Sequence, residues 1–482
     1  MEEIKMASRD EGEPLSPTAK LFHEPSLNCY VIAMVGCKTS LNPQVIREGL
    51  CQTLLKHPRF ISQMVKKGKK TKWIPTTIDL DNHIIVPEID SNIEHPDRFV
   101  EDYISNFTKT PLDLSKPLWE LHLLNIKTSN AEAVGVFRIH HSIGDGVSLI
   151  SLLIAATRKS SNLDALPTVP TQKRDTLHHR SSPFWWWLMA IWWGLVLIWH
   201  TMVDLVLFTL TIFFIKDTPT PLKGQLGVEL NNKRFTYCIV SMDDIKLVKN
   251  EMNTTINDVL LAITQAALTR YLNRAYGLDE NSNGVKHRSN VLKKIQLRAS
   301  ILVNIRPVGG IQDLADMMAE KSKVKWGNGM GYIILPFSIG LHEDPLEYVR
   351  QAKATIDRKK HSLEAICSYT CAKLVLNLLG VKVAATITRR VLFNTTLSFS
   401  NVLGPVEEIS FYGHHVEYIA PGVYGHPQAL TIHFQSYANK MTISLSVDPL
   451  VIPDPYLLCD DLEQSLKLIC DVVKRKHSTN VV

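Results

Sequence analysis

The ten residues 137–146, which read FRIHHSIGDG, have the residue types and spacing of a general-base site. An imidazole can accept a proton near neutral pH because its unperturbed pKa is about 6.5. The carboxylate of Asp145 follows His141 by four residues. It can either return beneath the imidazole ring or hold the loop, and the glycines at 144 and 146 permit sharp backbone turns beside it. This spacing predicts a general base fixed by its own loop.

Adjacent histidines alone are a weak signal. The chain has 18 histidines, and adjacent pairs occur at 140–141, 178–179 and 414–415. Only the first pair has Asp and Gly at these offsets, and a motif with fixed offsets is rarer by chance than a pair. A strand end with two hydrogen-bonded histidines remains the alternative for this pair, and it is the favoured interpretation of the other two.

Two elements must position these residues. The apolar run 134–139 has the composition of a strand that enters a core. The strongly apolar run 147–156 predicts a helix directly after the Asp-Gly turn. The base would therefore lie at the end of a buried strand. Strand and helix signals alternate along the rest of the chain, which predicts an α/β or α+β fold.

Composition limits the classes of function. At 482 residues the chain can hold two core-sized domains, and an apolar content of 45% is typical of a folded protein. The net charge of +6 is modest for this length, so it gives no case for nucleic-acid binding. The eight cysteines show no metal-site spacing, so we expect no metal, reduced thiols and a protein that faces the cytosol.

Two further stretches carry candidate site residues. Thr255 and Asp258 form a capping-box pattern at the start of a predicted helix, with Asp in place of the usual Glu. Asn257 is then left at the positive end of that helix, where it is well placed to point into a cleft. Trp119 opens a predicted strand over 118–126, where a core position is the favoured structural interpretation.

The run 183–215 is the longest apolar stretch of the chain. It contains a cluster of six tryptophans, namely Trp185, Trp186, Trp187, Trp192, Trp193 and Trp199. As one helix it would be about 50 Å long, against about 30 Å for the hydrocarbon core of a bilayer. Aromatic enrichment of this kind is typical of a membrane–water interface. The composition therefore predicts membrane association.

The geometry of this insertion has three interpretations. A single transmembrane span would place residues 1–180 and 217–482 on opposite sides of the membrane, where they could not share an active site. An interfacial helix or shallow hairpin keeps both halves on one face, so we favour monotopic insertion. A buried core helix is the third interpretation, and six tryptophans argue against it.

The motifs occur in the order that one family has. They are Pro117-Leu118-Trp119, His140-His141 with Asp145-Gly146, Asn257-Asp258, Asn304-Ile305-Arg306-Pro307 and Asn401-Val402-Leu403-Gly404-Pro405. With this set the chain resembles the wax ester synthase/diacylglycerol acyltransferase family, most of all its plant branch, which also carries a hydrophobic insertion. The resemblance runs from about Pro14 to the C-terminal helix. Leu403 departs from it, because many relatives have proline there, and we expect only a local effect on the loop.

The resemblance implies a fold of two chloramphenicol-acetyltransferase-like domains, α/β (α+β) in class, that face a shared tunnel. The HHxxxDG element is shared with other CoA-dependent acyltransferases. The expected organisation is a flexible tail over 1–13, an N-terminal domain over 14–180, a membrane-associating insertion over 181–217 and a C-terminal domain over 218–482.

The resemblance also implies roles for single residues. His141 is the general base, His140 orients it, and Asp145, followed by Gly146, holds the loop by a structural pairing. The expected substrate-contacting residues on the opposite wall and nearby are Asn257, Asp258 and Trp119.

The implied reaction is transfer of a fatty acyl group from acyl-CoA to a long-chain fatty alcohol, with diacylglycerol as a second acceptor. Acyl-CoA is a co-substrate, and no cofactor, metal or protein partner is expected. Membrane lipids are the expected surroundings, at the endoplasmic reticulum with a cytosol-facing site, or at the plasma membrane. Two alternatives remain, namely acyl transfer to a soluble alcohol or amine and a catalytically silent lipid-binding protein of the same fold.

Overall fold

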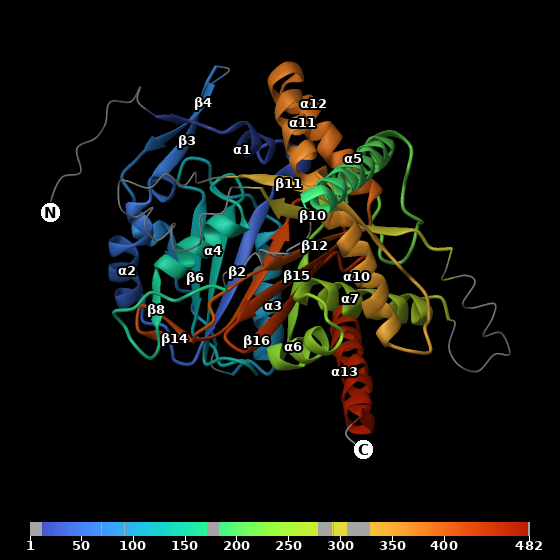
Figure 1. Ribbon diagram of the computed structural model, residues 1–482. Coiled ribbons are helices and arrows are strands. Elements are labelled where there is room, and N and C mark those ends of the chain that lie inside the picture. Colours follow the sequence, from blue (N-terminus) through green and yellow to red (C-terminus); the bar gives the residue numbers. More distant parts are fainter. Residues whose placement is uncertain are drawn as a thin grey trace.

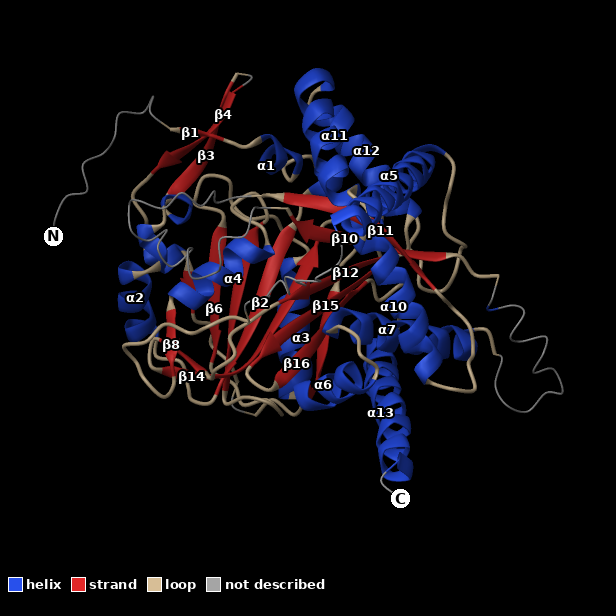
Figure 2. Ribbon diagram, viewed as in Figure 1, coloured by secondary structure: helices blue, strands red, loops and turns tan. Residues whose placement is uncertain are grey.

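The computed structural model describes residues 12–68, 70–90, 92–170, 183–277, 292, 294–305 and 328–480. Two large sheets make up its centre, and helices cover them (Figures 1 and 2). Residues 1–11 of the expected tail lie outside the described residues. Glu13, the last residue of that tail, belongs to a small sheet of order β1 (Glu13–Pro14), β4 (Lys70–Pro75) and β3 (Ser62–Lys67).

The first large sheet carries the histidine pair. Strand β7 (Ala133–His140), the third of the seven, is buried along its whole length, as the apolar run 134–139 predicts. Three helices, α2 (Pro43–Gln52), α3 (Pro96–Phe107) and α4 (Gly146–Ala155), pack on this sheet and share its core. The strand order is β5 (Ile84–Ile85), β6 (Trp119–Leu124), β7 (Ala133–His140), β2 (Tyr30–Cys37), β14 (His414–Tyr424), β13 (Ile409–Phe411) and β8 (Thr157–Lys159).

The second large sheet has its own core. Its strand order is β11 (Met330–Phe337), β10 (Leu297–Asn304), β12 (Leu397–Val402), β15 (Leu430–Tyr437), β16 (Lys440–Val447) and β9 (Arg234–Ser241). The covering helices are α6 (Met242–Glu251), α7 (Ile256–Ala275), α10 (Leu346–Lys360) and α13 (Pro455–Asn480). Strands β10, β12 and β15 run parallel, and the other neighbours are antiparallel.

Strand β14 joins the two halves. It follows β12 of the second sheet, yet it pairs antiparallel with β2 of the first, with Tyr424 opposite Tyr30. Strand β13 pairs with β8 at the far edge of the same sheet. The segment 218–482, expected to form a separate C-terminal domain, thus lends residues 409–424 to the N-terminal sheet. The insertion at 181–217 therefore does not separate the residues of one sheet from those of the other, because strands that follow it belong to both sheets.

The apolar run 183–215 forms one helix, α5 (Pro183–Phe213). Its part Trp187–Phe213 is long and apolar enough to cross a membrane, judged by length and composition, and only 11% of its most apolar window is buried. The helix is therefore not a core helix. It contacts α11 (Glu364–Leu379) and α12 (Val381–Asn394), which stand beside the second sheet (Figure 1).

Candidate active site

The histidine pair lies where β7 ends. His140 is the last residue of the strand and pairs with Tyr30 of β2. The backbone N–H of His141 donates to the carbonyl of Cys29 at 2.9 Å, which extends the ladder by one bond. Helix α4 begins five residues later, with Asp145 as its N-cap. The pair is thus held between the central strands and a helix N-terminus, as the apolar runs on both sides predict.

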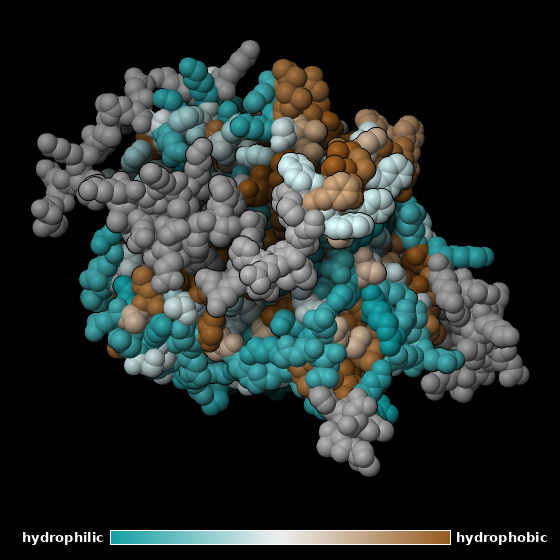
Figure 3. Space-filling view, in the orientation of Figure 1, coloured by the Kyte–Doolittle hydropathy of each residue, from teal (hydrophilic) through white to brown (hydrophobic). Residues whose placement is uncertain are grey.

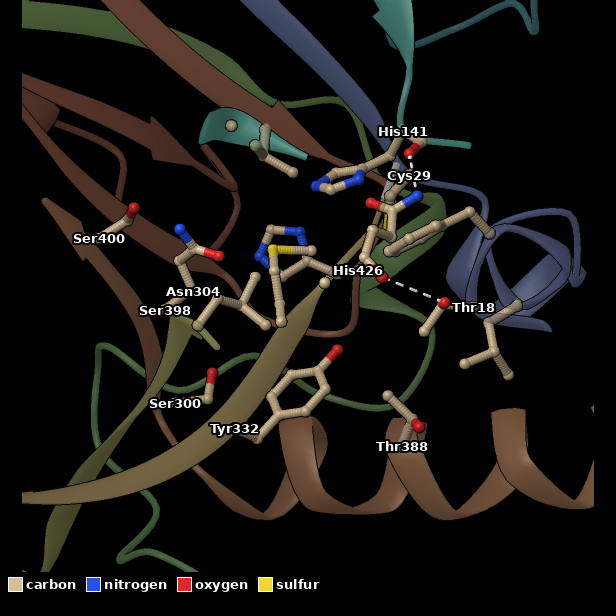
Figure 4. Close-up of a pocket in the computed structure, with 18 of the residues that line it drawn as sticks. Thr18, Cys29, His141, Ser300, Asn304, Tyr332, Thr388, Ser398, Ser400 and His426 are labelled. Atoms are coloured by element: carbon tan, nitrogen blue, oxygen red, sulfur yellow. Dashed lines mark hydrogen bonds between the residues drawn. The ribbon is translucent and has the colours of Figure 1, made fainter. Parts of the chain in front are cut away.

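His141 presents its imidazole to a cavity (Figure 4). The ring stacks on Phe22 directly after the short helix α1 (Pro17–Leu21), with ring centroids 4.3 Å apart. Its Nδ1 is buried and has no hydrogen-bond partner among the described residues. Burial lowers the pKa of His141, and the charge of Asp145 opposes this effect. The ring is therefore neutral at physiological pH and able to accept a proton.

His140 points away from the cavity, because successive residues of an extended chain face opposite sides. Its Nδ1 lies 2.7 Å from Ser142 Oγ, and its Nε2 lies 3.0 Å from Asn28 Oδ1. The ring stacks on His23 at 4.3 Å, and burial holds its pKa well below 6.5. The alternative of a hydrogen-bonded strand-end histidine therefore describes His140 but not His141.

Asp145 holds the loop that carries the histidine pair. Its side chain is fully buried. Oδ1 accepts a hydrogen bond from the N–H of Ser148 at 3.0 Å, which caps α4. Oδ2 accepts one from the N–H of Gly329 at 3.1 Å. Gly329 belongs to the second half of the chain, so this carboxylate also ties the halves together.

Asn328, the neighbour of Gly329, makes a second tie. Its Nδ2 donates to the backbone carbonyl of His141 at 3.1 Å. The backbone carbonyl of Asn328 accepts a hydrogen bond from Thr18 Oγ1 at 3.3 Å (Figure 4). Asn328 lies two residues before β11 and belongs to none of the motifs that the sequence singled out. Its contact with the histidine loop joins residues 187 positions apart, and no local pattern marks such a contact.

Gly146 lies at the junction of two cavities. The larger has a volume of about 640 Å³ and is lined by both halves of the chain. The smaller, of about 90 Å³, is apolar and lies beneath α4. Both touch Val31, Gly146, Val402 and Pro421. A Cβ at position 146 would lie 3.9 Å from Val402 Cγ2, which is ordinary van der Waals contact, so crowding does not require glycine here.

Two further histidines, which belong to none of the motifs named above, line the large cavity from the second half. His426 lies opposite His141 (Figure 4), and its Nε2 is 2.8 Å from Thr431 Oγ1. Burial lowers the pKa of His426 to about 3 and that of His433 to about 4. Nδ1 of His426 and Nε2 of His433 are buried without a partner among the described residues. The cavity therefore offers three neutral imidazoles.

The close approach of two chain segments sets the place of His426. Gly425 has φ of 90°, and a Cβ there would lie 2.0 Å from the carbonyl oxygen of Asn28. Only glycine fits this conformation and this contact. Asn28 also hydrogen-bonds His140. The contact between Gly425 and Asn28 therefore fixes His426 relative to the strand end that carries the histidine pair.

The other predicted site residues lie outside the cavity lining. Asp258 is buried and completes the capping box of α7, accepting from the N–H of Thr255 at 2.7 Å. Asn257 is exposed, and its Oδ1 accepts a hydrogen bond from Asn401 Nδ2 at 2.7 Å. Asn401 does line the cavity. Neither Asn257 nor Asp258 lines the cavity itself, and Asn257 is linked to it through Asn401.

Trp119, expected to contact the substrate, is a core residue. It is fully buried, its Nε1 donates to the carbonyl of Phe60 at 2.9 Å, and it stacks on His83. The indole therefore has its hydrogen-bond partner inside the first half. Arg306 and Pro307 of the quoted motifs lie outside the described residues. Among the described residues no group of three or more His, Cys, Asp or Glu side chains could hold a metal ion.

Two family models match the chain. Residues 38–260 match the wax ester synthase/diacylglycerol acyltransferase catalytic domain, and residues 326–470 match the WS/DGAT C-terminal domain. Among curated relatives, wax ester synthase/diacylglycerol acyltransferase 11 of Arabidopsis thaliana is 53% identical over 476 residues, which cover 97% of each chain. Wax ester synthase/diacylglycerol acyltransferase 5 of the same plant is 51% identical and covers 99% of this chain and 97% of its own.

Solved structures share the fold at low identity. The wax ester synthase/diacylglycerol acyltransferase from Marinobacter aquaeolei VT8 has a TM-score of 0.59 and 17% identity, and the match covers 96% of this chain and all of that one. The first condensation domain of the calcium-dependent antibiotic synthetase has a TM-score of 0.55 and 11% identity, over 96% of this chain and 97% of its own. The predicted two-half fold is thereby confirmed. From the two family models and the near-complete match to its relatives, the chain belongs to the wax ester synthase/diacylglycerol acyltransferase family.

Proposed function

We propose that this protein is an O-acyltransferase that moves a fatty acyl group from acyl-CoA to a long-chain fatty alcohol, with diacylglycerol as a second acceptor. The names of the Arabidopsis relatives support both acceptors. The observation that carries the proposal is the neutral, buried imidazole of His141, which points into a cavity that both halves line. A neutral base in a largely apolar cavity suits a hydroxyl on a lipid chain.

In the proposed mechanism His141 removes the proton of the acceptor hydroxyl as its oxygen attacks the thioester carbonyl. A tetrahedral intermediate forms and then collapses, with cleavage of the bond between the acyl carbon and sulfur. The ester forms, and the CoA thiolate takes the proton from His141 and leaves as the thiol. The reaction is balanced by acyl-CoA and alcohol alone, so it calls for no cofactor, no metal and no cysteine nucleophile.

The surrounding residues position this base. Asp145 and Asn328 fix the loop and the backbone of His141 from opposite halves. His140 supports the strand end from the far side, and Phe22 covers the ring of His141. We assign Asn257 a supporting role behind Asn401.

We further propose that α5 holds the enzyme at the cytosolic face of the endoplasmic reticulum, with the plasma membrane as the alternative. The exposed apolar surface of this helix supports membrane association. Fatty alcohols, diacylglycerol and their esters partition into bilayers, whereas acyl-CoA is supplied from the cytosol. An enzyme at the interface meets both substrates.

The test is ester synthesis by microsomes from yeast that lacks neutral-lipid synthesis, supplied with labelled acyl-CoA and hexadecanol or diacylglycerol. We expect His141→Ala to lower the rate by about 10²- to 10⁴-fold, the range for a lost general base. His415→Ala, in a histidine pair outside the cavity, is the matched control and should leave the rate unchanged. Ester made at more than a tenth of the wild-type rate by His141→Ala would contradict the assigned base.

The same assay separates the two alternatives. Transfer to short soluble alcohols or amines, with none to hexadecanol or diacylglycerol, would identify a soluble-acceptor transferase. No ester from any acceptor at wild-type expression would identify a silent lipid-binding protein.

A further inference from the structure

Helix α11 has an apolar face that is exposed on the surface of the protein. Ile366, Leu374, Leu378 and Leu379 each expose more than half of their surface. Leu374 follows Ile366 by eight residues and Leu378 follows Leu374 by four, so these three side chains lie along one side of the helix, with Leu379 beside them at its end. Hydrophobic surface covers the projecting end of α11–α12, and hydrophobic residues mix with near-neutral ones over the neighbouring α5 (Figure 3). By length and apolarity α10 and α11 together would also suffice to cross a membrane, although the chain bends by 52° between them.

One face of α5 is fixed to the body of the protein. Asp204 Oδ1 lies 2.7 Å from Arg358 Nη2 and 3.0 Å from Lys359 Nζ, and it is fully buried. Thr201 Oγ1 accepts a hydrogen bond from the N–H of Leu363 at 3.0 Å. Trp193, eight residues before Thr201, stacks on His361 with ring centroids 4.9 Å apart. Because these contacts recur between residues 193 and 204, this part of the helix lies along the protein and does not leave it as a free span.

The opposite face of α5 is apolar and exposed. The aromatic residues Trp185, Trp187, Trp192 and Trp199 are each 61 to 65% exposed. Because α5 contacts α11 and α12, its free face and the α11 stripe belong to one continuous region of the surface. Tryptophan at this density is the side chain that prefers the level of the lipid headgroups.

Charge on this region has one sign. The acidic side chains of α5 and α11, Asp204 and Glu364, are buried and bound to Lys359. The exposed charged residues of the α11–α12 hairpin are cationic, namely Lys373, Lys382 and Arg390. An apolar surface with cations and without exposed acids complements a bilayer that contains anionic headgroups. A second copy of this surface would instead place cations against cations.

The inner side of the same helices lines the cavity. Tyr369, Ala372 and Leu376 of α11 and Thr388 and Leu392 of α12 face the space that contains His141. A thin wall of two helices therefore separates the candidate active site from the exposed apolar face.

We propose that the free face of α5 and the α11–α12 hairpin form a single surface that inserts into the cytosolic leaflet of an anionic bilayer, with α5 lying in the plane of the membrane. The hairpin then becomes a second membrane anchor. A further consequence, which rests on the proposed function, is that the lipid acceptor reaches the cavity beside α11 and α12 without leaving the bilayer.

The chain contains its own probes for this surface. Cys371 is exposed on the apolar face of α11, seven residues before Leu378, and Cys51 is exposed on α2 of the first half. Full-length protein in microsomes that have been opened to both sides would be treated with a charged maleimide or a lipid-soluble maleimide. Cys51→Ser and Cys371→Ser assign the signals, in a Cys367→Ser background.

We expect Cys51 to react with both reagents and Cys371 to react only with the lipid-soluble one until detergent is added, with at least a tenfold difference in the rate with the charged reagent. Equal reaction of both thiols with the charged reagent would show that α11 faces water and would overturn the proposal. Reaction of Cys371 with neither reagent would show that protein covers the face, which also overturns it.

Variants test the same surface independently of any activity. Leu374→Ser with Leu378→Ser removes two exposed side chains, so the melting temperature should stay unchanged while Cys371 becomes reactive toward the charged maleimide. Leu450→Ser, at an exposed turn of the second half, is the control and should change nothing. An unchanged labelling pattern in the double variant would count against insertion of the hairpin.

Ester synthesis then tests the acceptor route. The double variant should lose several-fold in rate with hexadecanol and keep its rate with a short, water-soluble alcohol. Equal losses with both alcohols would overturn the route beside α11. Absence of all ester synthesis in wild type would refute the proposed function and leave the labelling result to decide the membrane surface.

Discussion

At the scale of residues, the two histidines of one motif do different work. They are neighbours at a strand end, so their side chains point to opposite sides of the sheet. His140 has both ring nitrogens within hydrogen-bond distance of partners, whereas His141 faces the cavity. The motif and its sidedness could be predicted from sequence. Phe22, Asn328 and His426 could not, because each reaches the site through a contact with no local pattern.

The depressed pKa of His141 predicts the pH dependence of the reaction. A general base acts in its neutral form, and burial lowers the pKa of this group below the usual 6.5. As pH falls through 6.5 the ring of the free enzyme stays neutral, so kcat/KM should hold there and decline only at more acidic pH. A pH profile of kcat/KM with hexadecanol checks this. An acidic limb with its midpoint at or above 6.5 would contradict a buried, neutral base.

At the scale of elements, helix starts were the most predictable features. The capping box at Thr255 and the apolar run after the Asp-Gly turn are local signals, and α7 and α4 begin within one residue of where these predict. Helix α12 was not anticipated, because its sequence is rich in β-branched residues and gives a weak helical signal. Its formation depends on packing against α1, α5 and α11 instead.

Asp145 is expected to matter for stability as much as for activity. Asp145→Ala removes the N-cap of α4 and leaves the N–H groups of Ser148 and Gly329 without this acceptor. A lost cap costs about 1 kcal/mol, and each buried unsatisfied donor costs about 1–3 kcal/mol. We therefore expect a clearly lower melting temperature for Asp145→Ala, and a smaller decrease for Asp145→Asn, whose amide oxygen can still accept.

Thermal melts of both variants beside wild type measure this difference. If Asp145→Ala melted at the wild-type temperature and yet made no ester, the carboxylate would have a chemical role that the loop contacts do not explain.

At the scale of the whole molecule, the fold class and the two-half organisation could be predicted from the ordered motifs. The pairing of β13 and β14 with the first sheet could not be predicted, because the alternation of residues within a strand does not specify its partner strand. Trp119 lies in the core, as the sequence favoured, and Phe60 supplies the acceptor for its indole N–H. The expected contact with substrate came from the resemblance.

Buried neutral histidines predict that the protein is unstable in acid. Burial lowers the pKa of His23, His57 and His433 to about 4 and that of His426 to about 3. Below pH 6.5 the unfolded chain binds protons that the folded protein cannot, so stability is retained above 6.5 and falls as pH drops toward 4. Each such group contributes about 1.4 kcal/mol per pH unit in this window.

Melting temperatures between pH 7.5 and 4.5 check this expectation. His433→Gln should flatten the decline, because one proton fewer is then taken up on unfolding. Leu450→Ser, which changes an exposed side chain that does not titrate, should leave the decline as it is. A melting temperature that rises on acidification would contradict neutral burial of these rings.

The pairing of Tyr30 with Tyr424 also constrains how early the first sheet can be completed during translation. The ribosome releases the histidine loop early, but β2 keeps one open edge until the last strands have emerged. An open strand edge is a template for joining the wrong neighbour. The nascent chain must therefore be shielded for most of its translation, and a premature stop before position 424 would yield aggregate rather than a smaller working enzyme.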